Sequence, residues 1–251
     1  LLSLKKYSDI PMEAVNILFV ESVAGVSYEP LKKSFPCKFH RQNVFLNNIR
    51  DILTAGKNKY VFFMVDDLIF RDDFSLEKEE AFLDAHPEVE CFSHRMGRNI
   101  GPGPLPEFKN ISEEYLVWKT SRTLGKHWNY FWEVSSSIYR KPMVLEYLEK
   151  CKSEKVKFPN PFEYHYYSCM PSTREPGFLR TVNLLKFPFS HRHNVMACYE
   201  RSKCFTQGVN TVAKIDDPKC KELFDPLALQ RKMEEGYVAD YISIKDAEIT
   251  S

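Results

Sequence analysis

Residues 60–70 read YVFFMVDDLIF, an apolar run from Val61 to Val65 that ends in two adjacent carboxylates, Asp66 and Asp67. The run is too short to cross a membrane, and its unbroken hydrophobicity predicts a strand that is covered on both faces. Such strands are typical of parallel or mixed α/β sheets, which bind ligands beyond the carboxyl ends of their strands. We therefore expect Asp66 and Asp67 at a ligand-binding end of the sheet.

The two neighbouring carboxylates would repel each other unless a cation or hydrogen-bond donors compensate their charge. Mg²⁺ commonly takes one or two carboxylates together with substrate phosphates. Asp66 and Asp67 therefore indicate a divalent metal site for Mg²⁺ or Mn²⁺. Because Asp is also a frequent turn residue, the alternative is a turn in which one Asp caps the backbone and the other is solvated.

The segments around this run predict alternating strands and helices. Strands are expected at 14–22, 60–65 and 89–94, and helices at 43–55 and 75–86. This alternation predicts a doubly wound α/β sheet that is flanked by helices. In the less regular second half we expect extended chain at 128–140, a helix at 141–151, a strand at 180–189 and a terminal helix at 222–235.

Composition narrows the class of protein. The 251 residues suit one large α/β domain. Lys and Arg number 35 against 34 Asp and Glu, a balance that argues against a nucleic-acid partner. No window reaches the ~20 apolar residues of a membrane span. The seven scattered cysteines form no Cys-x-x-Cys motif, so we expect reduced thiols and a cytoplasmic protein.

Three further segments follow the acidic strand end in a recognisable order. They are CFSHRMGRN at 91–99, EVSSSIYR at 133–140, and the turn FPNP at 158–161 with Glu163 after it. With these segments the chain resembles, over nearly its whole length, a family of small GT-A-fold glycosyltransferases known mainly from bacteria and large viruses. The resemblance implies one GT-A-like domain over 1–251, with a nucleotide-sugar-binding half at 1–95 and an acceptor-side half at 96–251.

The resemblance also implies an activity. A hexosyl or deoxyhexosyl group would move from a nucleotide-diphosphate sugar to a hydroxyl of a glycan or another acceptor, with Mn²⁺ or Mg²⁺ on the diphosphate. The acidic strand end corresponds to the Asp-x-Asp signature of the fold, although Val65 stands at its first position. The resemblance implies that Asp67 binds the metal and that Asp66 contacts metal-bound water or the ribose.

Arg95, Arg98 and Asn99 follow the 89–94 strand and are expected to bind the donor. Guanidinium groups offset the charge of a diphosphate and can hold it through paired hydrogen bonds. The alternative is that the arginines are surface residues on a loop.

Candidates for proton transfer and for a further metal ligand come from the second half. Glu133 is expected to take the proton of the acceptor hydroxyl as a general base, with Glu163 as the second candidate. Alternatively, Glu133 is an acid on a strand face that bonds to the serine hydroxyls of 135–137. His191 or His193 is expected to join the two carboxylates on the metal, unless both are ordinary loop residues.

The ends of the sequence and two other functions complete the expectations. The chain begins Leu1-Leu2 without Met, which suggests a fragment, and the family's first strand, which holds the nucleotide base, is expected upstream of it. A catalytically inactive carbohydrate-binding relative is one alternative function. A nucleotidyltransferase is another, but it would need a phosphate loop rich in glycine and lysine, which we do not find.

Overall fold

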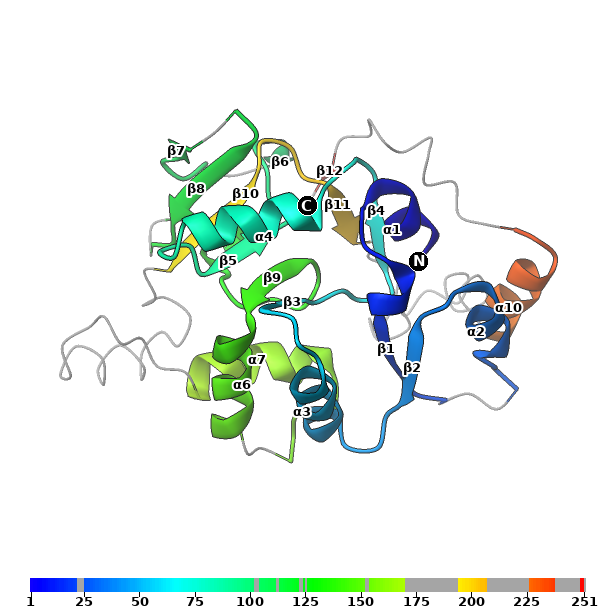
Figure 1. The fold of residues 1–251 in the computed structure, drawn as a ribbon. Coiled ribbons are helices and arrows are strands. Elements are labelled where there is room, and N and C mark those ends of the chain that lie inside the picture. The colour runs from blue at the N-terminus through cyan, green and yellow to red at the C-terminus, as the bar shows by residue number, and fades with distance from the viewer. Residues whose placement is uncertain are drawn as a thin grey trace.

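The computed structural model describes residues 1–21, 25–101, 104–111, 113–121, 124, 126–151, 154–169, 194–206, 226–237 and 249–250. These residues form a mixed α/β fold, in which a six-stranded mixed sheet is flanked by helices (Figure 1). None of the helices in the described ranges is long and apolar enough to span a membrane.

The helices are α1 (Leu2–Tyr7), the 3₁₀ turn η1 (Met12–Ala14), α2 (Glu29–Ser34), α3 (Phe45–Ala55), α4 (Leu76–Ala85), α5 (Lys126–Asn129), α6 (Lys141–Lys150), α7 (Pro159–Cys169) and α10 (Pro226–Glu234). The strands are β1 (Asn16–Phe19), β2 (Lys38–Arg41), β3 (Tyr60–Phe62), β4 (Leu68–Phe70), β5 (Cys91–Ser93), β6 (Ile100–Gly101), β7 (Lys109–Asn110), β8 (Tyr115–Lys119), β9 (Ser137–Arg140), β10 (Val195–Tyr199), β11 (Cys204–Thr206) and β12 (Ile249–Thr250).

The main sheet has the strand order β3-β9-β5-β10-β8-β7. Only β5 and β10 run parallel to each other, and every other neighbouring pair is antiparallel. Three two-stranded sheets accompany it: β1 with β2 and β6 with β12 are parallel, and β4 with β11 is antiparallel. The sheet is therefore mixed, as expected, but mostly antiparallel.

The apolar run at 60–65 forms a shorter strand than predicted. β3 ends at Phe62 and pairs only with β9, antiparallel, at the edge of the main sheet. Successive side chains of a strand point to opposite faces, and here they enter two different clusters. Phe62 stacks on the ring of His94 with centroids 4.6 Å apart, whereas the ring of Phe63 lies 5.9 Å from that of Trp132. The predicted apolar cover on both faces is therefore confirmed.

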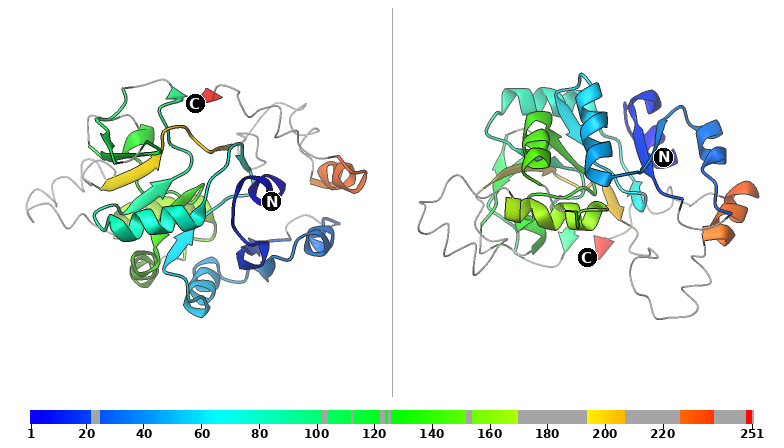
Figure 2. Two further views of the ribbon diagram at one scale, coloured as in Figure 1. Left: turned by 45° about the horizontal axis from the view of Figure 1, so that its top comes forward. Right: turned by 90° about the horizontal axis from the view of Figure 1, so that it is seen from below.

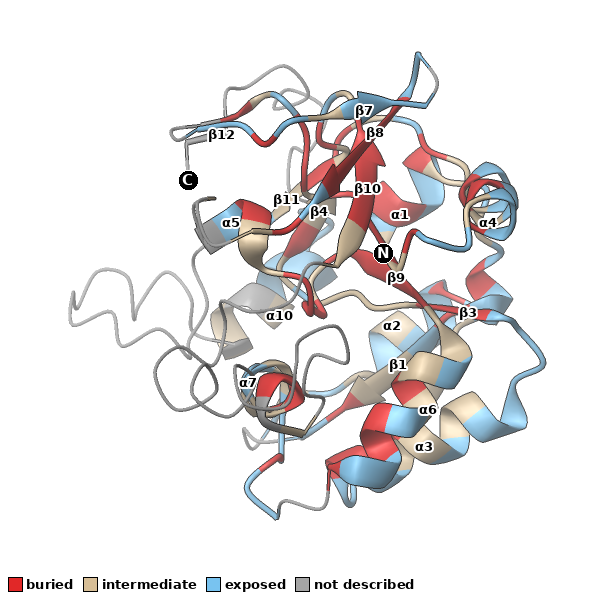
Figure 3. Ribbon diagram, turned by 90° about the vertical axis from the view of Figure 1, so that its left-hand side faces the viewer, coloured by how far each residue is buried: buried red, intermediate tan, exposed pale blue. Residues whose placement is uncertain are grey.

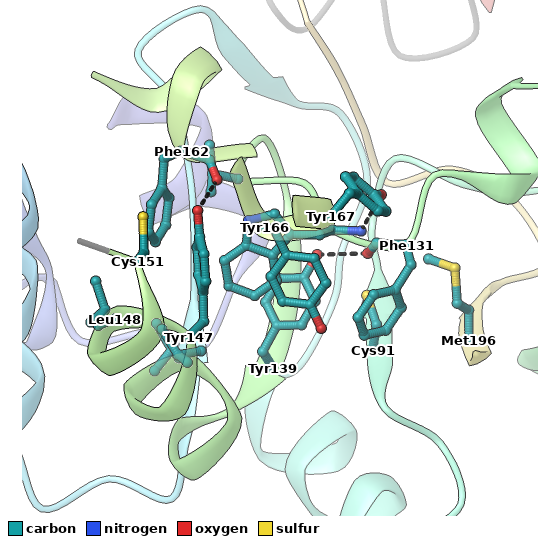
Figure 4. Close-up of a cluster of buried hydrophobic side chains, with 14 of the residues drawn as sticks. Cys91, Phe131, Tyr139, Tyr147, Leu148, Cys151, Phe162, Tyr166, Tyr167 and Met196 are labelled. Atoms are coloured by element: carbon teal, nitrogen blue, oxygen red, sulfur yellow. Dashed lines mark hydrogen bonds between the residues drawn. The ribbon is translucent and has the colours of Figure 1, made fainter. Parts of the chain in front are cut away.

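The two hydrophobic clusters lie on opposite faces of the sheet. The first joins it to α3, α6 and α7, and the second joins it to α1 and α4. Buried residues gather along β8, β9 and β10, while α3 and α4 turn one side to solvent (Figure 3). Aromatic rings dominate the first cluster, where Tyr147 donates to the carbonyl of Phe162 at 2.6 Å (Figure 4). In the same cluster the ring of Trp132 stacks on that of Tyr166, with centroids 4.5 Å apart.

Several helix boundaries agree with their sequence signals. α3 ends directly before Gly56, and Pro142 stands in the first turn of α6. Ser75 caps α4, because its hydroxyl accepts a hydrogen bond from the amide of Lys78 at 3.3 Å. α10 covers 226–234 of the helix expected at 222–235, whose first four residues lie outside the described ranges, and it lies beside α2, where the amide of Ser27 donates to Gln230 at 2.9 Å (Figure 2).

The prediction of extended chain throughout 128–140 was wrong. Residues 126–129 form α5, the next residues are irregular, and only 137–140 form a strand. The amide groups of this backbone donate their hydrogen bonds to side chains rather than to a neighbouring strand. The hydroxyl of Tyr167 accepts from the amide of Trp132 at 2.9 Å, and that of Tyr139 accepts from the amide of Glu133 at 2.8 Å. The strand expected at 180–189 lies outside the described residues.

Candidate functional site

The ends of three neighbouring strands, β3, β9 and β5, lie together along the edge of the sheet that the strand ends form. β9 is antiparallel to both β3 and β5, and Ile138 pairs with Phe62 on one side and with Phe92 on the other. The carboxyl ends of β3 and β5 therefore lie beside the amino end of β9. The acidic pair follows β3, Arg95 follows β5, and Glu133 precedes β9, so the fold directs the main predicted site residues to this edge.

Asp66 and Asp67 occupy the tip of a tight turn. The amide of Leu68 donates to the carbonyl of Val65 at 3.3 Å and closes the turn around the two acids. Asp66 is exposed and Asp67 is half-buried. Phe63 packs against Trp132, and three residues of chain span at most about 11 Å. The acidic turn therefore follows within three residues of a side chain that packs against the segment carrying Glu133.

Tyr28 lies in the electrostatic range of a further carboxylate that the sequence analysis did not name. Burial raises the pKa of Tyr28, and the charges of Asp66 and then Glu21 raise it further. Glu21 also pairs with Arg41 at 3.3 Å. Its position near the end of the strand expected at 14–22 was the sequence signal that could have identified it.

The described residues suit a metal ion that is bound partly by substrate phosphates, rather than one that is bound by protein side chains alone. Within the described ranges, no three His, Cys, Asp or Glu side chains are grouped so that they could hold a metal ion. A cation that sits on substrate phosphates needs only one or two carboxylates, which Asp66 and Asp67 can provide. His191 and His193 lie outside the described residues, so their predicted metal role stays a prediction.

Glu133 is the centre of a buried hydrogen-bond network. Its Oε2 accepts from Nε and Nη2 of Arg95 at 2.8 and 2.7 Å. Its Oε1 accepts from the hydroxyls of Ser93 at 2.9 Å and Ser137 at 2.6 Å. With the side chain only 2% exposed, burial acts to raise the pKa of Glu133, but Arg95 and the hydroxyls outweigh it and hold the pKa below its ordinary value.

This network bears on the role expected for Glu133. Each carboxylate oxygen already accepts two hydrogen bonds, and the ionised form is stabilised. A group in this state is a poor proton acceptor for a substrate. The geometry instead matches the alternative, in which Glu133 bonds to serine hydroxyls, and it adds the orientation of Arg95.

A second carboxyl group, Glu163 of α7, lies beside this network with a different environment. Its Oε1 accepts from the amide of Val134 at 2.7 Å, and its Oε2 accepts from the hydroxyl of Tyr130 at 3.0 Å. The residue is half-buried. Burial, followed by the charge of Glu133, raises the pKa of Glu163 to about 7 against the opposing effects of Val134, Tyr130 and Arg95. Two carboxyl groups of different proton affinity thus lie within the influence of one guanidinium charge, that of Arg95.

Arg98 and Asn99 are directed elsewhere. Nε of Arg98 pairs with Glu200 at 2.8 Å, and its guanidinium lies 4.6 Å from the ring centroid of Phe108. Oδ1 of Asn99 accepts from the amide of Ser202 at 2.9 Å. These contacts fix the 97–99 turn against 200–202. Of the three residues predicted to bind the donor, only Arg95 is brought to Glu133.

A buried trio supports the site from the second cluster. Nε2 of His94 lies 2.8 Å from Oε1 of Glu79, which also accepts from the hydroxyl of Tyr199 at 2.6 Å. Nδ1 of His94 lies 3.1 Å from the carbonyl oxygen of Ser136. The trio thereby ties the segment before β9 to α4. Glu79 lies on the apolar face of α4, three residues before Phe82 and four before Leu83. This spacing is the feature of the sequence from which its burial could have been predicted.

A separate hollow of about 440 Å³ lies between the β1–β2 pair and α3. Asn16 and Lys38, the first residues of β1 and β2, line it together with His40, Asp51 and Gly56. It therefore includes the amino ends of these parallel strands, whereas α/β sheets bind their ligands at the carboxyl ends. We do not assign it to the site.

Comparison with known proteins gives one relevant similarity. A stretch of 145 residues is 26% identical to the bifunctional glycosyltransferase pgtA of Dictyostelium discoideum, and it covers 50% of this chain but 19% of that protein. No protein-family model matches the chain. The similarity is thus to part of a glycosyltransferase.

Proposed function

We propose that this chain is a metal-dependent glycosyltransferase with a GT-A-like fold. It moves a hexosyl or deoxyhexosyl group from a nucleotide-diphosphate sugar to a hydroxyl of a glycan or another acceptor. The observation that carries the proposal is the placement of the Asp66–Asp67 turn after β3 and of Arg95 after β5, two strands that end on the same side of the sheet. The similarity to part of pgtA supports the same reaction class.

In this proposal Asp67, helped by Asp66, holds a divalent cation against the donor diphosphate, and Asp66 also contacts the ribose. A cation bound there supplies Lewis-acid stabilisation of the charge that develops on the leaving diphosphate. Arg95 adds a fixed positive charge at the same edge. Glu133 positions that guanidinium, because it accepts from both Nε and Nη2 and leaves Nη1 directed to His127 at 3.4 Å.

A thermal-shift titration tests the proposal. UDP, GDP and dTDP are added with and without Mn²⁺ to the wild-type chain and to Asp67→Asn. A nucleotide at 100 times its Kd adds about 2.7 kcal/mol, which corresponds to roughly 5–11 °C at this chain length. We expect such a shift for one nucleotide, dependent on Mn²⁺ and lost in Asp67→Asn.

Asp73→Asn is the matched control, because Asp73 is exposed and also follows another Asp in the chain. This variant should keep the full shift. The contrary outcome is a wild-type chain that shows no Mn²⁺-dependent shift with any nucleotide but is stabilised by glycans. It would contradict the transferase and indicate a carbohydrate-binding protein.

A further inference from the structure

Glu163 lies among side chains that can meet a substrate. Tyr164 beside it is 57% exposed, and Tyr130, which donates to Glu163, is half-buried. Burial and then the charge of Glu163 raise the pKa of Tyr130. The cluster therefore combines a carboxyl group, the partly exposed ring of Tyr130 and the nearby charge of the Arg95 guanidinium.

The hydrogen bonds of Glu163 leave acceptor capacity that Glu133 lacks. A carboxylate offers about four lone-pair sites. All four of Glu133 are occupied, whereas within the described residues Oε1 of Glu163 accepts one hydrogen bond from Val134 and Oε2 accepts one from Tyr130. These two bonds fix the orientation of the carboxyl group, and its partial exposure leaves a path for a hydroxyl to approach.

We propose that Glu163 is the proton acceptor for the acceptor hydroxyl, and that Tyr130 forms the wall against which a hydroxyl-bearing ring is placed. This assignment rests on the glycosyl transfer proposed above. Tyrosine rings suit the wall because each combines an apolar face with a polar end.

The step is a single displacement at the anomeric carbon of the donor. The acceptor O–H bond breaks and its proton goes to Glu163, while the acceptor oxygen forms a bond to the anomeric carbon. The bond from that carbon to the diphosphate oxygen breaks, and its electron pair leaves with the nucleoside diphosphate. Glu163 then releases the proton to solvent, which its partial exposure allows.

The environment of Glu163 suits this task near neutral pH. With a pKa of about 7, a large share of Glu163 is ionised at neutral pH and yet binds a proton readily. Because only the ionised form accepts a proton, the rate should rise with pH through about 7. The Tyr130 hydroxyl stabilises the ionised form, so its removal raises the pKa and moves this rise to higher pH.

The experiment measures release of nucleoside diphosphate from UDP-glucose, UDP-galactose, GDP-mannose and dTDP-glucose, with Mn²⁺ present and water as the acceptor. Glu163→Gln should lower kcat by at least about 100-fold and leave the Mn²⁺-dependent thermal shift with the nucleotide unchanged. Tyr130→Phe should remain active, with its pH profile displaced to higher pH. Glu149→Gln on the exposed side of α6 is the matched control and should behave as wild type.

The outcomes separate this inference from the proposed function. A wild-type chain that releases the nucleotide, together with Glu163→Gln at similar kcat or Tyr130→Phe with an unmoved profile, would overturn the role of Glu163 alone. A wild-type chain with neither turnover nor a nucleotide shift would overturn the glycosyltransferase as well.

Discussion

At the scale of single residues, Glu133 and Glu163 differ in what surrounds them rather than in chemical type. Glu133 is held by Arg95, Ser93 and Ser137, which lie 38, 40 and 4 residues away in the chain. Glu163 accepts hydrogen bonds from the amide of Val134 and the hydroxyl of Tyr130. The first environment stabilises a permanent anion, and the second leaves a group that exchanges protons near neutral pH.

Glu133→Gln should destabilise the fold. The substitution removes the charge that balances Arg95 and leaves amide hydrogens beside Ser93 and Ser137, so we expect a loss of about 2–4 kcal/mol in the free energy of unfolding. Urea denaturation measures this loss. Glu146→Gln, which removes an exposed helix pair with Lys150, should change the free energy by less than about 0.5 kcal/mol.

The same residue predicts a pH dependence of stability. The pKa of Glu133 is lower in the folded chain than its ordinary value of 4.5. Its contribution is therefore fully present above pH 4.5 and is lost as the pH falls through the lowered folded value. Glu133→Gln should flatten the acid side of the stability profile, and an unchanged acid side would contradict the ionised state.

At the scale of elements, the 97–99 turn is fixed by close backbone contact. A Cβ added at Gly97 would lie 2.3 Å from the amide nitrogen of Ser202, whereas one at Gly56 would meet its nearest atom at 3.6 Å. Gly97→Ala should therefore cost about 2 kcal/mol or more, because backbone must shift. Gly56→Ala is the matched control and should change stability by under about 1 kcal/mol. Thermal or urea unfolding measures the stability of both variants. Equal losses of stability would contradict the close contact at Gly97.

Elements with local signals could be predicted from the sequence, and those without could not. Gly56, Ser75 and Pro142 marked helix ends that the structure confirms. No local signal marked 128–136, because its backbone is satisfied by the hydroxyls of Tyr139 and Tyr167. The same limit applies to the site. The sequence named Arg95, Glu133 and Glu163 as candidates, but only the fold brings the three together.

At the scale of the whole molecule, the main sheet interleaves the two halves expected at 1–95 and 96–251. Strands β3 and β5 come from the first half, while β9 lies between them and β10 follows β5. Neither half can complete its strand pairing without the other. The expected single domain should therefore unfold cooperatively as one unit.

This cooperativity can be measured because all three tryptophans, Trp118, Trp128 and Trp132, belong to the second half. Their fluorescence follows that half together with the contact between Trp132 and Phe63, whereas hydrogen exchange at the amides of β3 and β5 follows the first half. We expect both probes to give the same free energy of unfolding within about 1 kcal/mol, because β9 cannot leave the sheet without exposing the edges of β3 and β5. A fragment of residues 1–95 should stay unfolded, since β3 would have lost its partner. The contrary outcome is that the amides of β3 and β5 exchange through an opening of lower free energy while the tryptophan fluorescence stays unchanged. That result would establish that the two halves are separate folding units.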